Sequence, residues 1–302
     1  MPPTPPPLWG YRFLVWAERD WPRWIFRPIF GLGVWVAVAL KKIERRSSRE
    51  YLSVVHGRPA GAGEVWRHFQ VFTEILMLRL RVARGEAHQY AAPVEHGAEF
   101  ESLLTSGEPV LWGTFHFGHS DLMGFALAQR GQSMSMVRMR GADAGELALL
   151  GERFGGMRFV WVNDPADVLF ALKERLESGD SVALQCDRVR HAAKTAAFEF
   201  LGAPRIFPVT IYHLAVLFGR PVMFCFGVPE GACGTRVIAT PVFRPDPHAS
   251  RAENLAAGHV HFQGVLTRLE GLVRQHPLLW FNFLPLNPVA VPRPEAVPAD
   301  VA

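Results

Sequence analysis

Two histidines and an aspartate lie close together in the segment FHFGHSD, which covers residues 115–121. These residues are His116, His119 and Asp121, and the apolar run PVLWGT directly precedes the segment. A carboxylate bonded to one imidazole nitrogen fixes the tautomer and leaves the other nitrogen free to take a proton. The same three side chains could instead bind a metal ion, or form an ordinary polar loop with Asp121 as a helix cap. The segment therefore predicts a general base, a metal site or a loop.

The elements around this segment alternate between strand and helix patterns. Apolar runs with strand character and amphipathic stretches with helical spacing follow one another along the chain. They predict strands at 109–115, 133–139, 157–162 and 180–185, and helices at 120–130, 143–154 and 165–178. This alternation predicts an α/β fold with a largely parallel or mixed central sheet flanked by helices. Ligands of such folds bind beyond the carboxyl ends of the strands, which is where His116 falls.

Three further elements complete the expected domain. An amphipathic helix is predicted over 62–84, a long helix over 251–275, and a strand pair over 221–228 and 236–243 with a Gly/Pro-rich turn between them. Neither an internal repeat nor an interior linker is visible in the sequence. We therefore expect one domain, preceded by an N-terminal helical segment.

Composition excludes several classes of protein. The chain has 302 residues, 49% hydrophobic and 20% charged, which is typical of a globular domain and excludes a disordered chain. No window of 18 or more unbroken apolar residues is present, which excludes a polytopic membrane protein.

The formal charge of +4 favours acidic partners such as anionic lipid, phosphorylated ligands or an acidic carrier protein. Without a basic tract interleaved with aromatic residues, nucleic acid is not an expected partner. The three cysteines are too scattered for a disulfide framework or a zinc site.

The N-terminal segment is rich in tryptophan and ends in basic residues. Its longest apolar stretch, Pro28–Leu40, has 13 residues. As a helix this stretch is about 20 Å long, against a hydrocarbon core of about 30 Å. We therefore expect a helix that lies in the membrane interface or inserts shallowly, with the basic residues 41–49 meeting anionic phosphates. The alternative is a core helix whose basic flank is simply solvated.

The spacing of His116 and Asp121 gives the pattern H-x4-D after an apolar strand. This pattern resembles the motif of the glycerolipid and lysophospholipid acyltransferases. The form HFG-x-x-D is similar to one branch of them, the bacterial lipid A lauroyl/myristoyl acyltransferases. The branch commonly has Asn and an aromatic residue at the positions of His119 and Ser120, and often Glu at the position of Asp121.

Three later segments are similar to further blocks of the same branch, in the same order. In MSMVRMRGAD, Arg138 aligns with a substrate-contacting arginine. The segment VALQCDRVRHAAKTAAFEFLGAPRIFPVT places Asp187 and Arg188 after a strand, and HPLLWFNFLPL resembles the terminal block through Pro277 and Trp280. Together the four blocks span roughly residues 110–285.

The resemblance implies roles for individual residues. His116 would be the general base, and Asp121 would orient it and stabilise its imidazolium. Gly118 would offer its backbone N–H to the developing oxyanion. No metal ligand is implied, and His119 is expected to be a residue of the pocket wall.

Three residues of the later blocks are expected at the substrate. The resemblance places Arg138 and Arg188 at a phosphate of the donor or acceptor, since guanidinium groups match phosphate oxygens. For both arginines the alternative is a surface ion pair, for instance with Asp187. We expect Asp187 to serve the substrate site rather than only the fold.

The implied activity is transfer of a fatty or polyene acyl group to a hydroxyl or amine of a lipid or glycolipid. The donor would be a thioester of an acyl carrier protein or coenzyme A, and no metal or redox cofactor is implied. The implied place is the cytoplasmic face of a bacterial inner membrane. Two alternatives stay open: a metal-dependent hydrolase built on His116, His119 and Asp121, and a non-catalytic membrane-bound partner with this scaffold.

The expected division of the chain follows from these observations. Residues 1–8 and 289–302 would be disordered tails, because both are rich in proline. Residues 9–50 would form the membrane-associating helical segment, and residues 51–288 the acyltransferase domain.

Overall fold

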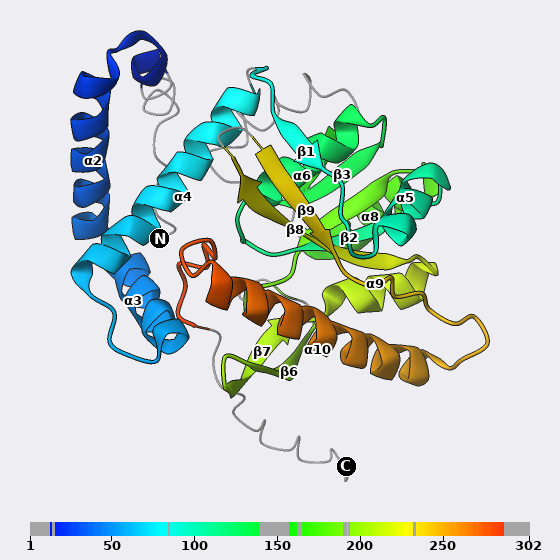
Figure 1. The fold of residues 1–302 in the computed structure, drawn as a ribbon. Coiled ribbons are helices and arrows are strands. Elements are labelled where there is room, and N and C mark those ends of the chain that lie inside the picture. Colours follow the sequence, from blue (N-terminus) through cyan, green and yellow to red (C-terminus); the bar gives the residue numbers. More distant parts are fainter. Residues whose placement is uncertain are drawn as a thin grey trace.

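A mixed α/β architecture around a central sheet characterises the computed structural model of the chain (Figure 1). The structure describes residues 13, 16–83, 85–138, 157–161, 165–189, 192, 194–231 and 234–286. The helices are α2 (Arg23–Leu40), α3 (Lys42–His56), α4 (Ala62–Ala83), α5 (Gly97–Thr105), α6 (Ser120–Gln129), α8 (Pro165–Glu177), α9 (Thr210–Phe218) and α10 (Arg251–Gln275). The strands are β1 (Gln89–Ala91), β2 (Leu111–Thr114), β3 (Met134–Arg138), β4 (Met157–Trp161), β5 (Ser181–Gln185), β6 (Thr195–Phe200), β7 (Ala203–Pro208), β8 (Val222–Glu230) and β9 (Gly234–Ala239).

The central sheet has seven strands in the order β1-β9-β8-β2-β5-β3-β4. The five strands from β8 to β4 run parallel to their neighbours, whereas β9 is antiparallel to β8. Strands β6 and β7 form a separate antiparallel hairpin. The predicted α/β fold with a largely parallel central sheet and flanking helices is confirmed.

Both faces of the sheet are buried. Successive residues of each strand point to opposite faces, so a single strand contributes side chains to the packing on both sides. On one face Phe224 of β8 packs against Phe262 of α10, with ring centroids 5.4 Å apart. On the other face Trp112 of β2 meets Phe100 of α5 at 5.6 Å. Gly113 follows Trp112 in β2, and a Cβ atom at Gly113 would overlap the ring of Phe224. The missing side chain of Gly113 therefore allows this aromatic face to close over β2.

Most elements agree closely with the sequence patterns. Helix α10 begins at the expected residue because Ser250 and Glu253 form a capping box, and α6 and α8 end within one residue of the prediction. The expected late strand pair is the antiparallel pair β8–β9. Four elements were not predicted from the sequence: α5, α9, β1 and the β6–β7 hairpin. The helix expected at 143–154 lies outside the described residues.

The N-terminal helices lie beside the sheet rather than over it (Figure 1). Helix α2 packs against α4, where Trp35 stacks on Trp66 with centroids 5.9 Å apart. Among the described side chains of α2 only Val34 and Val38 are buried, while Trp24 is 77% and Leu40 74% exposed. This exposure is the opposite of what a core helix would show.

The break between α2 and α3 bends the chain by 94°. Among the described residues, no helix taken alone has the length and apolar character to cross a membrane, although α2 and α3 taken together meet that test by length and composition. The guanidinium of Arg45 bonds the carbonyls of Val38 and Ala39, which satisfies backbone groups at the end of α2.

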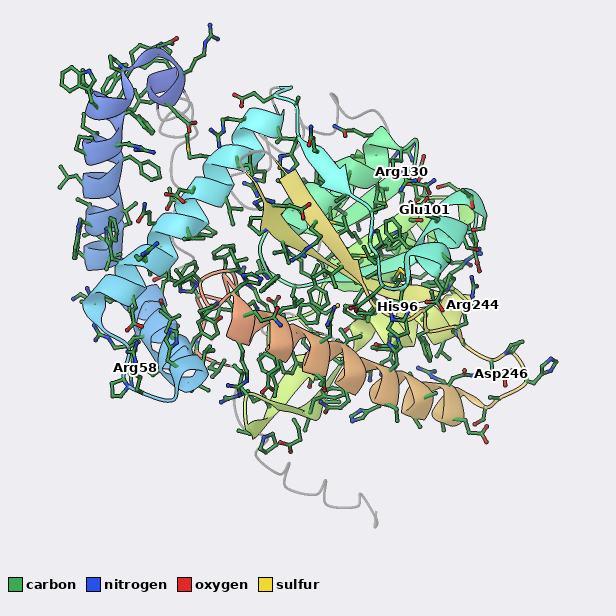
Figure 2. The ribbon with its side chains drawn as sticks, viewed as in Figure 1. Arg58, His96, Glu101, Arg130, Arg244 and Asp246 are labelled. Carbon is green, nitrogen blue, oxygen red and sulfur yellow. The ribbon has the colours of Figure 1, made fainter. Side chains whose placement is uncertain are left out.

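Pairs of opposite charge connect neighbouring elements at the surface, and Figure 2 labels one of them, Arg130 and Glu101. Arg130 of α6, for example, forms a two-pronged ion pair with Glu101 of α5, at 2.9 and 2.6 Å. Exposed pairs of this kind stabilise a fold only weakly.

Candidate active site

The sheet brings His116 and Asp187 together. Strands β2 and β5 are parallel neighbours, and their last residues, Thr114 and Gln185, are partners in the register. His116 and Asp187 each follow two residues later, so both side chains emerge at the same edge of the sheet. Nδ1 of His116 lies 2.7 Å from Oδ1 of Asp187, which makes a hydrogen bond between residues 71 apart in the chain.

Asp187 is completely buried, and its carboxylate is held by three N–H groups. Besides the imidazole on Oδ1, its Oδ2 accepts from the backbone N–H of His116 at 2.8 Å and from Nε1 of Trp280 at 2.9 Å. Burial by itself would raise the pKa of Asp187. The hydrogen bonds and charge of His116, the charge of Arg188 and the indole N–H of Trp280 outweigh burial and keep the pKa below its usual range. The carboxylate is therefore ionised at neutral pH.

An ionised Asp187 determines the tautomer of His116. The carboxylate can only accept, so in the neutral form of the ring Nδ1 of His116 carries the proton and Nε2 has the lone pair. The imidazole is 19% exposed, and within the described part of the chain no side chain hydrogen-bonds to Nε2. This arrangement presents an oriented base to a group that arrives from outside.

No described serine, threonine or cysteine is hydrogen-bonded to His116 as a protein nucleophile would be. Cys186, the cysteine next to Asp187, is buried, and burial raises the pKa of its thiol well above the usual range. Cys186 is therefore a small buried residue just beyond the end of β5, not a reactive thiol. A hydroxyl or amine for His116 to deprotonate would therefore come from a substrate.

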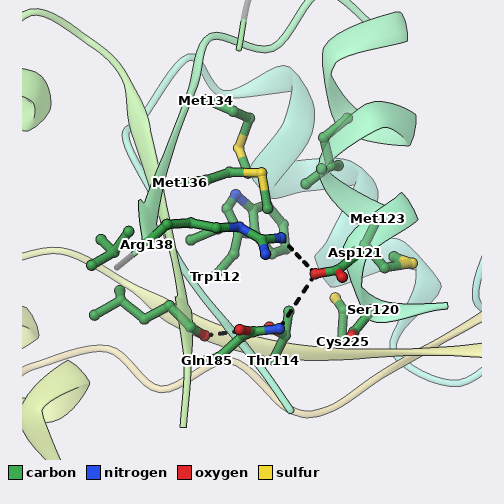
Figure 3. Close-up of a pocket in the computed structure, with 15 residues that line it drawn as sticks. Trp112, Thr114, Ser120, Asp121, Met123, Met134, Met136, Arg138, Gln185 and Cys225 are labelled. Atoms are coloured by element: carbon green, nitrogen blue, oxygen red, sulfur yellow. Dashed lines mark hydrogen bonds and ion pairs between the residues drawn. The ribbon is translucent and has the colours of Figure 1, made fainter. Parts of the chain in front are cut away.

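The expected pairing of His116 with Asp121 is wrong. Asp121 lies in the first turn of α6, and its carboxylate faces two arginines instead, one of which, Arg138, is seen in Figure 3. Arg79 of α4 bonds Oδ2 at 3.0 Å, Arg138 bonds Oδ1 at 2.5 Å, and Gln185 approaches Oδ1 at 3.4 Å. Burial would raise the pKa of Asp121, but the charges of Arg138, Arg79 and His116 hold it far below its usual range. Asp121 therefore acts on His116 through its charge, while Asp187 makes the hydrogen bond.

A small cavity lies behind this ion-pair cluster, between α6 and the sheet (Figure 3). Its volume is about 20 Å³, which leaves room for about one water molecule. Trp112, Met123, Met134 and Met136 form its apolar wall, and Asp121 stands on its polar side with Arg138 and Gln185. The ion-pair cluster thus lies on one side of a cavity whose other walls are mostly apolar.

The loop after His116 is held by the backbone of two other segments. The N–H of Gly118 donates to the carbonyl of Leu279 at 2.7 Å, and that of His119 to the carbonyl of Gly227 at 2.8 Å. The expectation that Gly118 offers its N–H to an oxyanion is therefore wrong, because this donor is already used. Gly118 has a positive φ of 53°, and a Cβ atom there would overlap the carbonyl oxygen of Gly227. Its contribution is the tight turn that carries the chain from β2 into α6.

His119 points away from His116. Its Nδ1 lies 2.6 Å from the hydroxyl of Thr235, which Nε2 of His88 also approaches at 2.7 Å. Burial, aided by the neighbouring His88, lowers the pKa of His119 to about 4, so the ring is neutral at neutral pH. The three residues of the metal hypothesis therefore do not converge. In the described ranges no group of three or more His, Cys, Asp or Glu side chains is arranged to hold a metal ion.

The two arginines expected at a phosphate differ in their surroundings. Arg138, at the end of β3, is 15% exposed and engaged with Asp121. Arg188 is exposed directly after Asp187, and its charge contributes to the lowered pKa of that carboxyl. Within the described ranges no hydrogen bond or ion pair to Arg188 is present, and the residue is exposed next to Asp187.

Three residues of the site were not predicted from the sequence as contributors to it. Arg79 stands among apolar residues of α4, and an arginine in such a run needs a buried partner, a signal that could have been used. Trp280 stood out only as a match to the terminal block, and Gln185 had no signal of its own. Both reach the site through pairings between distant segments.

Comparisons with known proteins find little beyond this geometry. No protein-family model matches the chain, and no curated protein sequence matches it. Among solved structures, the chain is similar to the 1-acyl-sn-glycerophosphate (LPA) acyltransferase PlsC from Thermotoga maritima. The match has 13% sequence identity and a TM-score of 0.40, and it covers 83% of this chain and 99% of that one.

Proposed function

We propose that this chain is an acyltransferase of the membrane surface. It moves a fatty or polyene acyl group from the thioester of an acyl carrier protein or coenzyme A to a hydroxyl or amine of a lipid or glycolipid. The observation that carries the proposal is the hydrogen-bonded His116–Asp187 pair. Among the described residues no protein nucleophile is hydrogen-bonded to Nε2 of His116. The resemblance of four sequence blocks to the lipid A acyltransferase branch supports the same reaction.

The reaction uses one base and no protein nucleophile. Nε2 of His116 takes the proton of the acceptor hydroxyl or amine as its oxygen or nitrogen attacks the thioester carbonyl carbon. The carbon–sulfur bond then breaks, and the leaving thiolate takes the proton back from the imidazolium. Asp187 stays ionised throughout and stabilises the imidazolium at 2.7 Å. A positioned base typically contributes about 10²–10⁴-fold to the rate, and no metal or redox cofactor enters this scheme.

The charges around the base suit an anionic substrate. Asp187 and Asp121 are ionised, and Arg79, Arg138 and Arg188 are positive, so this cluster carries one excess positive charge. Both coenzyme A and the prosthetic arm of a carrier protein bear phosphate, and the carrier protein is itself acidic. A positive rim would guide either donor to the site and increase its rate of encounter.

The N-terminal helices support the membrane part of the proposal. Trp24 and Leu40 are exposed on α2, and Ile43 follows just beyond the bend. The basic residues Lys41 and Lys42 are exposed at that bend. Tryptophan and aliphatic side chains insert at the level of the lipid headgroups, and lysines there meet anionic phosphates.

The test is transfer of radiolabelled acyl groups to a bacterial membrane lipid extract, with acyl carrier protein and coenzyme A thioesters as parallel donors. Wild type is compared with His116→Ala and with His248→Ala, which removes an exposed histidine near Asp246 at the far end of α10 (Figure 2). We expect a labelled lipid product that His248→Ala retains and His116→Ala reduces by at least about 10²-fold. Label released only as free acid, whichever acceptor is offered, would show that the chain hydrolyses thioesters and would overturn the proposal.

A further inference from the structure

A chain of buried hydrogen bonds leads from the His116–Asp187 pair into the N-terminal helices. Trp280 takes part in it twice. Its Nε1 donates to Asp187 at 2.9 Å, and its backbone carbonyl oxygen lies 3.0 Å from Nε2 of His68 on α4. Nδ1 of His68 in turn lies 2.8 Å from the hydroxyl of Ser48 on α3. Ser48, His68 and Trp280 are all buried to within 1% of complete.

The direction of each hydrogen bond in this chain is determined by chemistry. A carbonyl oxygen can only accept, so Nε2 of His68 carries a proton and donates to Trp280. Burial lowers the pKa of His68 to about 4, against a smaller opposite effect of the Trp280 carbonyl, so the ring is neutral and its Nδ1 accepts from Ser48. The bonds therefore have one consistent arrangement, with every polar atom of the imidazole satisfied.

Packing reinforces the same connection. Tyr51 of α3 meets the indole of Trp280 edge-on, with centroids 5.2 Å apart, and its hydroxyl donates to the carbonyl of Pro277 at 2.7 Å. The ring of His68 lies 4.6 Å from that of Phe283. Helices α3 and α4 thus hold the segment 277–283 from one side.

The loop of the base holds the same segment from the other side. The N–H of Phe281 donates to the carbonyl of His116 at 2.6 Å, and the N–H of Gly118 to that of Leu279. The segment is therefore fixed between the α3–α4 pair and the loop that carries His116. A shift of Trp280 would move the indole N–H away from Asp187 and release one of the three donors that orient this carboxylate.

We propose that His68 is a positioning residue for the His116–Asp187 pair, which it serves by fixing Trp280 between α4 and the carboxylate. On this reading α3 and α4 are part of the active site. They determine where Asp187 stands, and they link the tryptophan-rich N-terminal helices to the base. The inference rests on the proposed function for its kinetic readout, but the hydrogen bond between His116 and Asp187 can be followed independently.

The test combines kinetics with proton NMR of the full chain in detergent micelles. The proton shared by Nδ1 of His116 and Asp187 should give a far-downfield resonance, assigned by its loss in Asp187→Asn. His68→Phe keeps an aromatic ring but removes both ring nitrogens, whereas His68→Gln keeps an N–H donor that can reach Trp280. The matched control is His261→Phe, because His261 also bonds a hydroxyl (Tyr212) and a carbonyl (Pro241) but has no hydrogen bond to Trp280 or Asp187.

We expect His68→Phe to shift or broaden the downfield resonance and to lower kcat by about 10-fold or more with little change in KM, because a small displacement of a catalytic group is costly. His68→Gln should restore most of both, and His261→Phe should lower only the thermal midpoint. If His68→Phe behaves like His261→Phe, the inference is wrong. If His68→Phe does not fold, Ser48→Ala decides: an unchanged resonance and kcat in that variant would overturn the inference. The downfield resonance measures the hydrogen bond between His116 and Asp187 directly. It therefore tests the role of His68 even if no acyl transfer is found.

Discussion

Two aspartates lie near the candidate base, and their surroundings differ. Asp187, after β5, accepts from an imidazole, a backbone N–H and an indole N–H, so two of its three donors are uncharged groups in fixed positions. Asp121, at the start of α6, faces two guanidinium groups and a carboxamide, and its side chain is 29% exposed. Fixed donors hold Asp187 in one orientation, which suits a group that orients a base. Two arginines neutralise Asp121, which suits a group that arranges charge.

The comparison shows that closeness in sequence does not identify the partner of a base. Asp121 is five residues from His116, and Asp187 is 71 residues away, yet Asp187 makes the hydrogen bond. The histidine and the aspartate of an H-x4-D pattern can therefore have separate roles. Here Asp121 pairs with arginines, while the distant Asp187 forms the hydrogen bond with His116. The following predictions separate the two roles, beginning with the largest effect.

Asparagine at each position should give very different losses of activity. Asp187→Asn would present an amide to Nδ1 of His116 and favour the wrong tautomer, so we expect kcat to fall by about 10²–10⁴-fold. Asp121→Asn removes a charge but no bond to the base, so its loss should stay within about 10-fold and appear largely in KM. Steady-state acyl transfer with both variants checks this. An equal or larger loss in Asp121→Asn would reverse the assignment of roles.

Acid stability should depend on Asp121. Its pKa is lower in the folded chain than the ordinary value of 3.8, so its contribution to stability is fully present above that value and disappears as the pH falls. The free energy of unfolding of wild type should therefore fall on acidification below about pH 5, by at most about 1.4 kcal/mol per pH unit from this one group. Urea titrations from pH 6 to 3 should show the gap between wild type and Asp121→Asn closing. Parallel curves would contradict a lowered pKa.

Arg188 should affect donor capture more than chemistry. Its guanidinium is exposed beside Asp187, so Arg188→Ala should lower kcat/KM for an acidic carrier protein donor by about 2- to 10-fold and should do so less at high salt. Arg268→Ala is the matched control, since Arg268 is an exposed arginine paired with Glu95. A loss that added salt does not reduce would argue against steering by charge.

The smallest effect on activity is expected at Thr235. Its hydroxyl is the shared partner of His88 and His119, so Thr235→Val should cost about 1–3 kcal/mol of stability by leaving buried imidazole nitrogens unsatisfied. We expect kcat to stay within about twofold, because neither histidine contacts the base. Urea denaturation and initial rates on one preparation check both parts. A large loss of kcat without a loss of stability would bring His119 back as a catalytic candidate.

Local patterns predicted much of the scaffold. The capping box at Ser250 begins α10, and the apolar runs locate β2 and β5, so both His116 and Asp187 could be placed after buried strands. The β6–β7 hairpin was missed because its turn, at Leu201 and Gly202, has positive φ at a leucine, which no turn pattern predicts.

The sequence by itself determined that a histidine and an aspartate follow two buried strands, because strand and cap signals come from neighbouring residues. Only the tertiary structure decided that β5 pairs with β2, although β3 and β4 come between them in the chain. That pairing brings Asp187 to His116, turns Asp121 toward Arg79 and Arg138, and uses the N–H of Gly118 for Leu279. These contacts depend on packing between segments that are distant in the chain. A sequence pattern describes only neighbouring residues, so it cannot predict such packing.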